Sequence, residues 1–176
     1  MTASEQTPAY ATAPRPRRIR RVKLALFLSS LSACFSVSLI GLLAIVLTGL
    51  TAGQPPTQGG FKGGAVLAAQ LSLLNFIIFF LTVPAAAVAL GVSIAQFPRR
   101  GITARKAYLR WGAIWGALLV GVTNSLIGIM MDPAAGLGAL IVGGLIGGLA
   151  GCVCGLLFHA IVRPARQLAQ EDISVF

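Results

Sequence analysis

Residues 136–162 read GLGALIVGGLIGGLAGCVCGLLFHAIV. This long apolar run, rich in glycine, is the strongest indication of the fold in the sequence. In water, each interior glycine costs a helix roughly 1 kcal/mol relative to alanine. In a bilayer the backbone must satisfy its own hydrogen bonds, so the helix forms regardless. One row of glycines recurs at every fourth position, and a second pair lies one residue out of step: Gly143, Gly147, Gly151 and Gly155, then Gly144 and Gly148. At about 100° per residue the first row drifts across roughly 120°, which predicts a whole face for close helix packing, a glycine zipper.

The composition of the chain is that of an integral membrane protein. Of its 176 residues, 56% are hydrophobic and only 10% are charged, with a mean hydropathy of +0.86. Soluble domains carry about 25% charged residues, so a water-soluble fold is excluded. The net charge of +10 could suggest nucleic acid as a partner. The basic residues instead fall into tight clusters between long apolar runs, which is the pattern of membrane topology, and we expect no nucleic-acid binding.

The distribution of positive charge predicts the orientation of the chain. The segment RPRRIRRVK, residues 15–23, precedes the first apolar run and holds six basic residues: Arg15, Arg17, Arg18, Arg20, Arg21 and Lys23. Residues 98–110 hold five more and the C-terminal tail holds two, whereas the two opposite loops hold only Lys62. The positive-inside rule therefore places both termini and the middle loop in the cytoplasm, and a bacterial inner membrane fits this design. The N-terminal cluster is a topological anchor, a contact for anionic lipid head groups, or both.

Four apolar runs are each long enough to cross the hydrocarbon core, which needs about 20 residues. We expect an all-α, four-transmembrane-helix bundle over residues 24–162, with both termini inside and glycine-zipper packing on the fourth helix. Residues 1–23 form a disordered polar tail plus a basic cytoplasmic anchor, and residues 163–176 form a short cytoplasmic tail. Pro84 should kink the second span, because proline removes one backbone hydrogen bond. The predicted spans are 24–50, 65–97, 107–131 and 136–162.

Small residues recur on one face of each predicted helix, in the half that lies near the cytoplasm. Gly112 and Gly116 form such a pair in the third span, and Ala87, Gly91 and Ala95 form such a row in the second. Faces of small residues let helices approach closely. We therefore expect a bundle that is narrow in its cytoplasmic half and wider near the outer face.

The apolar runs lack the residues that most membrane chemistry requires. All four acidic residues fall outside the middle of a span: Glu5, Asp132, Glu171 and Asp172. Proton or cation coupling usually needs an ionisable group at that depth. His159 is the only histidine, and Cys152 and Cys154 lie about 200° apart on a helix, so they cannot easily share a metal. We expect no catalytic residue, no metal site and no cofactor, and hence a protein that is not an enzyme.

Polar residues inside the spans leave two functional hypotheses open. Asn75 and Thr82 are seven residues apart and share a face of the predicted helix, and the third span carries three more: Thr123, Asn124 and Ser125. These side chains make either interhelical hydrogen bonds or a polar path for a small solute. On the first hypothesis, which we favour, the protein is a structural, accessory or assembly subunit that packs against other membrane subunits or against itself. On the alternative, it is a homo-oligomeric small pore or transporter without an intramembrane carboxylate for proton coupling.

Overall fold

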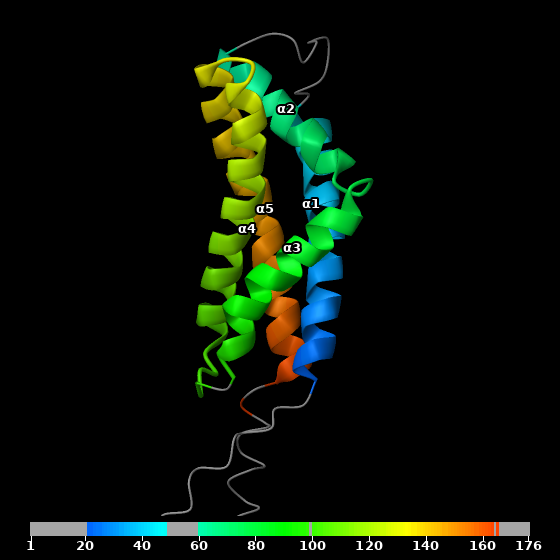
Figure 1. The fold of residues 1–176 in the computed structure, drawn as a ribbon, viewed down its shortest axis with the longest axis vertical. Coiled ribbons are helices and arrows are strands. Elements are labelled where there is room, and N and C mark those ends of the chain that lie inside the picture. The colour runs from blue at the N-terminus through cyan, green and yellow to red at the C-terminus, as the bar shows by residue number, and fades with distance from the viewer. Residues whose placement is uncertain (1–20, 49–59, 99, 164, 166–176) are drawn as a thin grey trace, which may run out of the picture.

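The computed structural model describes residues 21–48, 60–98, 100–163 and 165, which form five α-helices and one short 3-10 helix. The long helices α1 (Val22–Thr48), α4 (Arg105–Ile129) and α5 (Pro133–Val162) run along the long axis of the molecule (Figure 1). Between α1 and α4 in the sequence lie α2 (Gly60–Leu74), α3 (Phe79–Val92) and the 3-10 helix η1 (Ile94–Gln96). Six of the basic residues fall outside the described ranges: Arg15, Arg17, Arg18, Arg20, Arg99 and Arg166.

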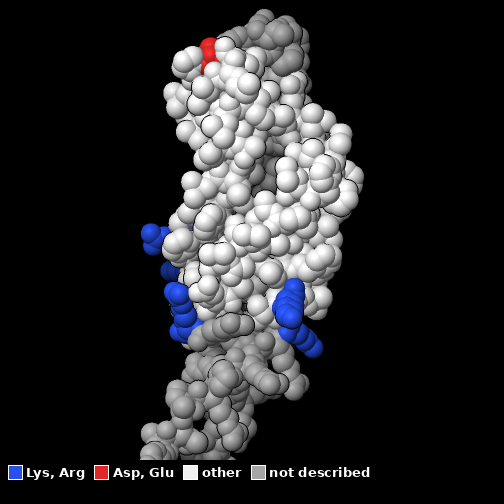
Figure 2. All heavy atoms as spheres, in the orientation of Figure 1, with Lys and Arg blue, Asp and Glu red and all other residues white. Residues whose placement is uncertain are grey.

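The structure agrees with the membrane class that the composition predicts. Helices α1, α4 and α5 are each long and apolar enough to cross a membrane, and α2 with α3 makes a fourth span if the bent pair counts as one. Lys and Arg side chains gather at the end where α1 begins and α5 ends, and the acidic side chain in view lies at the opposite end (Figure 2). The described part of the chain is therefore an all-helical molecule with three or four apolar spans and charge near its ends.

The first, third and fourth spans differ from the predicted ones by only a few residues at their ends. Helix α5 begins at residue 133 instead of 136 because Asp132 caps it. The Oδ1 atom of Asp132 accepts hydrogen bonds from the backbone amides of Ala134 (2.7 Å) and Ala135 (2.9 Å). Pro133 occupies the first helical position, where its missing amide proton costs nothing. A helix start of this kind can be read from the sequence alone.

The same carboxylate also holds the start of a second helix. Oδ2 of Asp132 accepts a hydrogen bond of 2.6 Å from the backbone amide of Gly60, the first residue of α2. The amides of Gly60 and Ala135 hold the pKa of Asp132 below its usual value, because they stabilise the charged form. Asp132 therefore joins α2 to α5 at the end of the bundle opposite the start of α1 and the end of α5.

The prediction of a single helix over residues 65–97, kinked at Pro84, is wrong. The chain is already helical from residue 60, breaks at residues 75–78, and resumes as α3 at an angle of 95° to α2. The break does not lie at Pro84, where we expected it, because α3 continues through that proline. After the break α3 crosses the bundle obliquely toward the start of α4 (Figure 1). Hydrogen bonds of Asn75, described below, accompany the break.

Helices α4 and α5 form the most extensive contact in the fold. A Cβ atom on Gly116 would overlap the carbonyl oxygen of Gly147, and one on Gly112 would overlap the carbonyl oxygen of Gly151. These two backbones therefore touch directly over about one turn, which requires glycine on both sides. The remaining glycines of the first row meet α4 as well: Gly143 at Asn124 and Gly155 at Tyr108.

Candidate functional site

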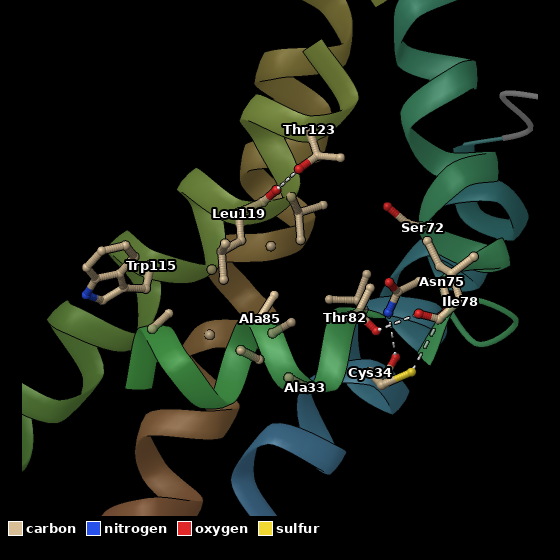
Figure 3. Close-up of a pocket in the computed structure, with 18 of the residues that line it drawn as sticks. Ala33, Cys34, Ser72, Asn75, Ile78, Thr82, Ala85, Trp115, Leu119 and Thr123 are labelled. Carbon is tan, nitrogen blue, oxygen red and sulfur yellow. Dashed lines mark hydrogen bonds between the residues drawn. The ribbon is translucent and has the colours of Figure 1, made fainter. Parts of the chain in front are cut away.

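A cavity of about 430 Å³ lies in the middle of the molecule, and all five α-helices contribute to its lining. It exists because α3, after the 95° bend, lies obliquely across the face of α4 and α5 and does not pack along them. Most of the residues that line the cavity are Leu, Ile, Val, Ala or Gly (Figure 3). A hollow between α4 and the α2–α3 bend is visible on the same face of the molecular surface (Figure 2).

Asn75 both ends α2 and forms part of the cavity wall. Its Nδ2 donates to the backbone oxygen of Cys34 on α1 (3.4 Å), and the Cys34 thiol donates back to the backbone oxygen of Asn75 (3.6 Å; Figure 3). The amide of Asn75 turns back to the oxygen of Ser72 (3.3 Å), and that of Ile77 to the oxygen of Leu74 (2.8 Å). Backbone polar groups at a break inside a bilayer need partners of this kind. At the break, the Cys34 thiol pairs the backbone oxygen of Asn75, and the side chain of Asn75 in turn fixes the bend to α1.

Four of the five predicted polar residues line this one cavity. Asn75 and Thr82 do so from the two sides of the bend, although they no longer share a face of one helix, and Thr123 and Asn124 do so from α4. The amide of Asn124 donates across to the backbone oxygen of Ala68 on α2 (3.5 Å). The hydroxyls of Thr82 and Thr123 donate to carbonyl oxygens of their own helices or the adjoining turn. Ser125 is half-buried on α4 and does not line the cavity.

The small residues near the basic end do not close the bundle as we expected. Gly112, Gly116, Gly147 and Gly151 bring α4 and α5 together, yet each also borders the cavity. The cavity therefore lies against the small-residue faces and not near the outer end. The physical reason is the bend, which sends α3 across these faces at an angle and leaves the space over them unfilled.

The second glycine pair of α5 has different surroundings from the first row. A Cβ atom on Gly144 would meet no heavy atom within 4 Å, and one on Gly148 would make only ordinary contacts at 3.7 Å, with Ala113 and Ala117. Beside this pair runs an exposed apolar ridge at every fourth position of α5: Leu137, Ile141, Leu145, Leu149 and Val153. Both glycines border α4, because a Cβ atom on Gly121 would lie 3.0 Å from the Cα of Gly144 and both neighbours of Gly148 belong to α4. The open part of this side of α5, which we call the outer face of α5, is the exposed ridge beside the pair.

Aromatic side chains hold the basic end of the bundle together. Tyr108 is fully buried; its hydroxyl donates to the backbone oxygen of Ile102 (2.9 Å), and its ring meets Phe97, Phe158 and His159. The Nε2 atom of His159 lies 3.2 Å from the backbone oxygen of Thr103, so the histidine ties α5 to the loop before α4. Across the described ranges no three His, Cys, Asp or Glu side chains come together as metal ligands would.

Sequence reasoning missed two polar members of the cavity, Ser72 and Cys34. Ser72 is 2% exposed, and its hydroxyl has no hydrogen-bond partner within the described structure. Serine and cysteine are common packing residues in membrane helices, so neither residue indicated from the sequence that it lines a cavity. Only the bend, which brings the end of α2 over α1, places them beside Asn75.

Comparisons of this chain with protein-family models, with curated proteins and with solved structures give no match. Its function must therefore be inferred from the residues themselves and their placement, because a fold alone does not specify function.

Proposed function

We propose that this chain is a non-enzymatic accessory or assembly subunit of a membrane complex. It binds a helix of a partner subunit along the outer face of α5. The observation that carries the proposal is the different use of the two glycine rows. The glycines of the first row pack against α4, whereas a Cβ atom on Gly144 would meet no heavy atom within 4 Å, although the backbone of Gly144 borders Gly121 of α4. A partner helix that rests on Gly144 and Gly148 could approach closely, and the ridge beside them would add apolar contact area.

The orientation follows from the charge distribution. We place the basic end, where α1 begins and α5 ends, in the cytoplasm, and the α4–α5 turn with Asp132 on the outer side of a bacterial inner membrane. Arg21 and Lys23 are exposed at the start of α1 and would lie beside anionic head groups. Each such residue contributes about 1 kcal/mol to attraction by an anionic surface.

Native mass spectrometry of the full chain, extracted with its surrounding lipid at endogenous expression level, tests this proposal. We expect a defined complex with another polypeptide in the wild type, and its loss in Gly144→Leu, because leucine would occupy the space where the partner's backbone rests. Gly91→Leu is the matched control, since a Cβ there would meet only a leucine side-chain carbon at 3.7 Å on another helix. The proposal fails if Gly144→Leu retains the complex, or if both variants lose it alike.

The pore or transporter keeps one observation in its favour, the gathering of four polar residues at a single cavity. The amides of Asn75 and Asn124, however, donate to backbone oxygens of neighbouring helices, which favours a structural role for both. Solute or ion flux in proteoliposomes separates the two functions. We expect both the wild type and Asn75→Ala to show only the background flux of empty vesicles. A flux above background in the wild type that Asn75→Ala changes, with assembly intact, would favour the pore.

A further inference from the structure

The cavity has the size and lining of a site for an apolar molecule. Its volume of about 430 Å³ falls within the roughly 300–1,000 Å³ of small-molecule sites. Among the described residues that line it, none is Lys, Arg, Asp, Glu or His. A charged ligand would be buried there without a counter-ion, which is strongly unfavourable. The lining therefore selects an uncharged occupant.

The rim of the cavity opens toward the region that lipid would fill. Several side chains that line it are also largely exposed on the flank of the molecule, among them Ile77 (67%) and Leu81 (64%). These residues belong to the bend and to α3, which lie midway between the two ends of the bundle (Figure 1). An occupant that reaches the cavity past such a rim comes from the hydrocarbon phase and not from water.

One polar group inside the cavity has no partner in the protein. The hydroxyl of Ser72 is buried without a hydrogen bond, and in Figure 3 its oxygen points toward the space between α2 and α4. A helical serine usually satisfies its hydroxyl on a carbonyl of the preceding turn, and a buried hydroxyl without a partner is unfavourable. The other unpartnered polar atom among the lining residues, Nε1 of Trp115, points away from the cavity in the same view.

The depth of Ser72 limits the kind of ligand that could pair with it. Twelve residues separate it from the start of α2, which is about 18 Å of helix, and the hydrocarbon core is about 30 Å thick. Phospholipid head groups stay at the surface of that core. A molecule that brings a hydrogen-bonding group to Ser72 must carry it deep into the bilayer, which costs an uncharged group far less free energy than a charged one.

We propose that this cavity binds an uncharged, mainly apolar molecule from the lipid phase, whose single hydroxyl or carbonyl group pairs with the Ser72 hydroxyl. The site is separate from the outer face of α5 and goes beyond the accessory function proposed above. Ser72 supplies the polar contact, and the alanines and glycines of α3, α4 and α5 leave the room for the hydrocarbon part.

Photolabelling of the full chain in phospholipid nanodiscs tests the site. The probe is a secondary alcohol with its hydroxyl near mid-chain and a diazirine beside it, and its competitors are the same alcohol and the same hydrocarbon, each without the diazirine. We expect label on buried residues that line the cavity, such as Leu90, and saturable competition by the alcohol. Since phospholipid is already in large excess in the disc, labelling that cannot be competed would mean that bulk lipid chains fill the cavity, and would overturn the proposal.

Variants of matched serines separate the polar contact from general packing. Ser72→Ala should weaken competition by the alcohol roughly 2- to 10-fold, as expected for one lost hydrogen bond, and leave competition by the hydrocarbon unchanged. Ser29→Ala is the control, because Ser29 is also fully buried with an unpartnered hydroxyl but does not line the cavity. Equal effects of the two variants, or equal effects of Ser72→Ala on both competitors, would refute the role of Ser72.

Filling the cavity gives a second test that does not depend on the hydroxyl. Ala85 is exposed and lines the cavity from α3, so a leucine there occupies part of the space without entering the protein core. Ala85→Leu should reduce labelling of the buried Leu90 at least several-fold. Unchanged labelling in this variant, with label spread over lipid-facing residues such as Leu47, would show that the probe binds only to the outer surface.

Discussion

Replacing Gly116 by alanine should separate α4 from α5 and destabilise the monomer. The new Cβ would lie 2.9 Å from the carbonyl carbon of Gly147 and 3.0 Å from the Cα of Gly151, and closer still to the Gly147 oxygen. Carbon atoms in ordinary contact are about 3.5–4.0 Å apart, so the helices must part by roughly 1 Å. Each of these atoms belongs to the backbone, so no side-chain rotation relieves the overlap.

The expected cost is about 1–3 kcal/mol, the usual range for overpacking a well-packed interior. It corresponds to a roughly 5- to 150-fold change in the unfolding equilibrium. Gly144→Ala is the matched control on α5, because its Cβ meets no heavy atom within 4 Å. That variant should range from unchanged to about 1 kcal/mol more stable, since alanine favours a helix over glycine.

Reversible unfolding by sodium dodecyl sulfate in mixed micelles measures both variants. Helix content by circular dichroism and the fluorescence of Trp111 and Trp115, both on α4, provide independent probes of the transition. Gly116→Ala should lower the free energy of unfolding relative to Gly144→Ala by about 1 kcal/mol or more. Equal stabilities of the two variants would refute the inferred backbone contact between α4 and α5.

Two further predictions concern the ends of the bundle. Backbone amides lower the pKa of Asp132, so its contribution to stability is present above the usual aspartate pKa and is lost as the pH falls through the lower folded-state pKa. Asp132→Asn should remove this part of the loss of stability at low pH. Identical dependence of the unfolding free energy on pH in the variant and the wild type would contradict the prediction. Tyr108→Phe should cost about 1 kcal/mol because the oxygen of Ile102 loses its donor; an unfolding midpoint equal to that of the wild type would show that this hydrogen bond contributes nothing.

The amino-acid sequence alone determined the class of the protein and most helix ends. Long apolar runs require helices in a bilayer, because the backbone has no other hydrogen-bond partners there. The signal for the start of α5, Asp132 with Pro133, is also local, although our prediction placed that start at residue 136. The small residues that meet between α4 and α5 were also recognisable from their spacing.

The tertiary structure alone decided which glycine row faces inward, where the second span breaks and what the break leaves open. Spacing marks a helix face but not the neighbour that covers it, so Gly143 and Gly144 look alike in sequence and differ only in their surroundings. Pro84 was the obvious local candidate for a kink, yet the chain bends at Asn75, whose side chain pairs with Cys34, 41 residues earlier. Such a hydrogen bond has no local signature. The cavity and the unpartnered hydroxyl of Ser72 both follow from that bend.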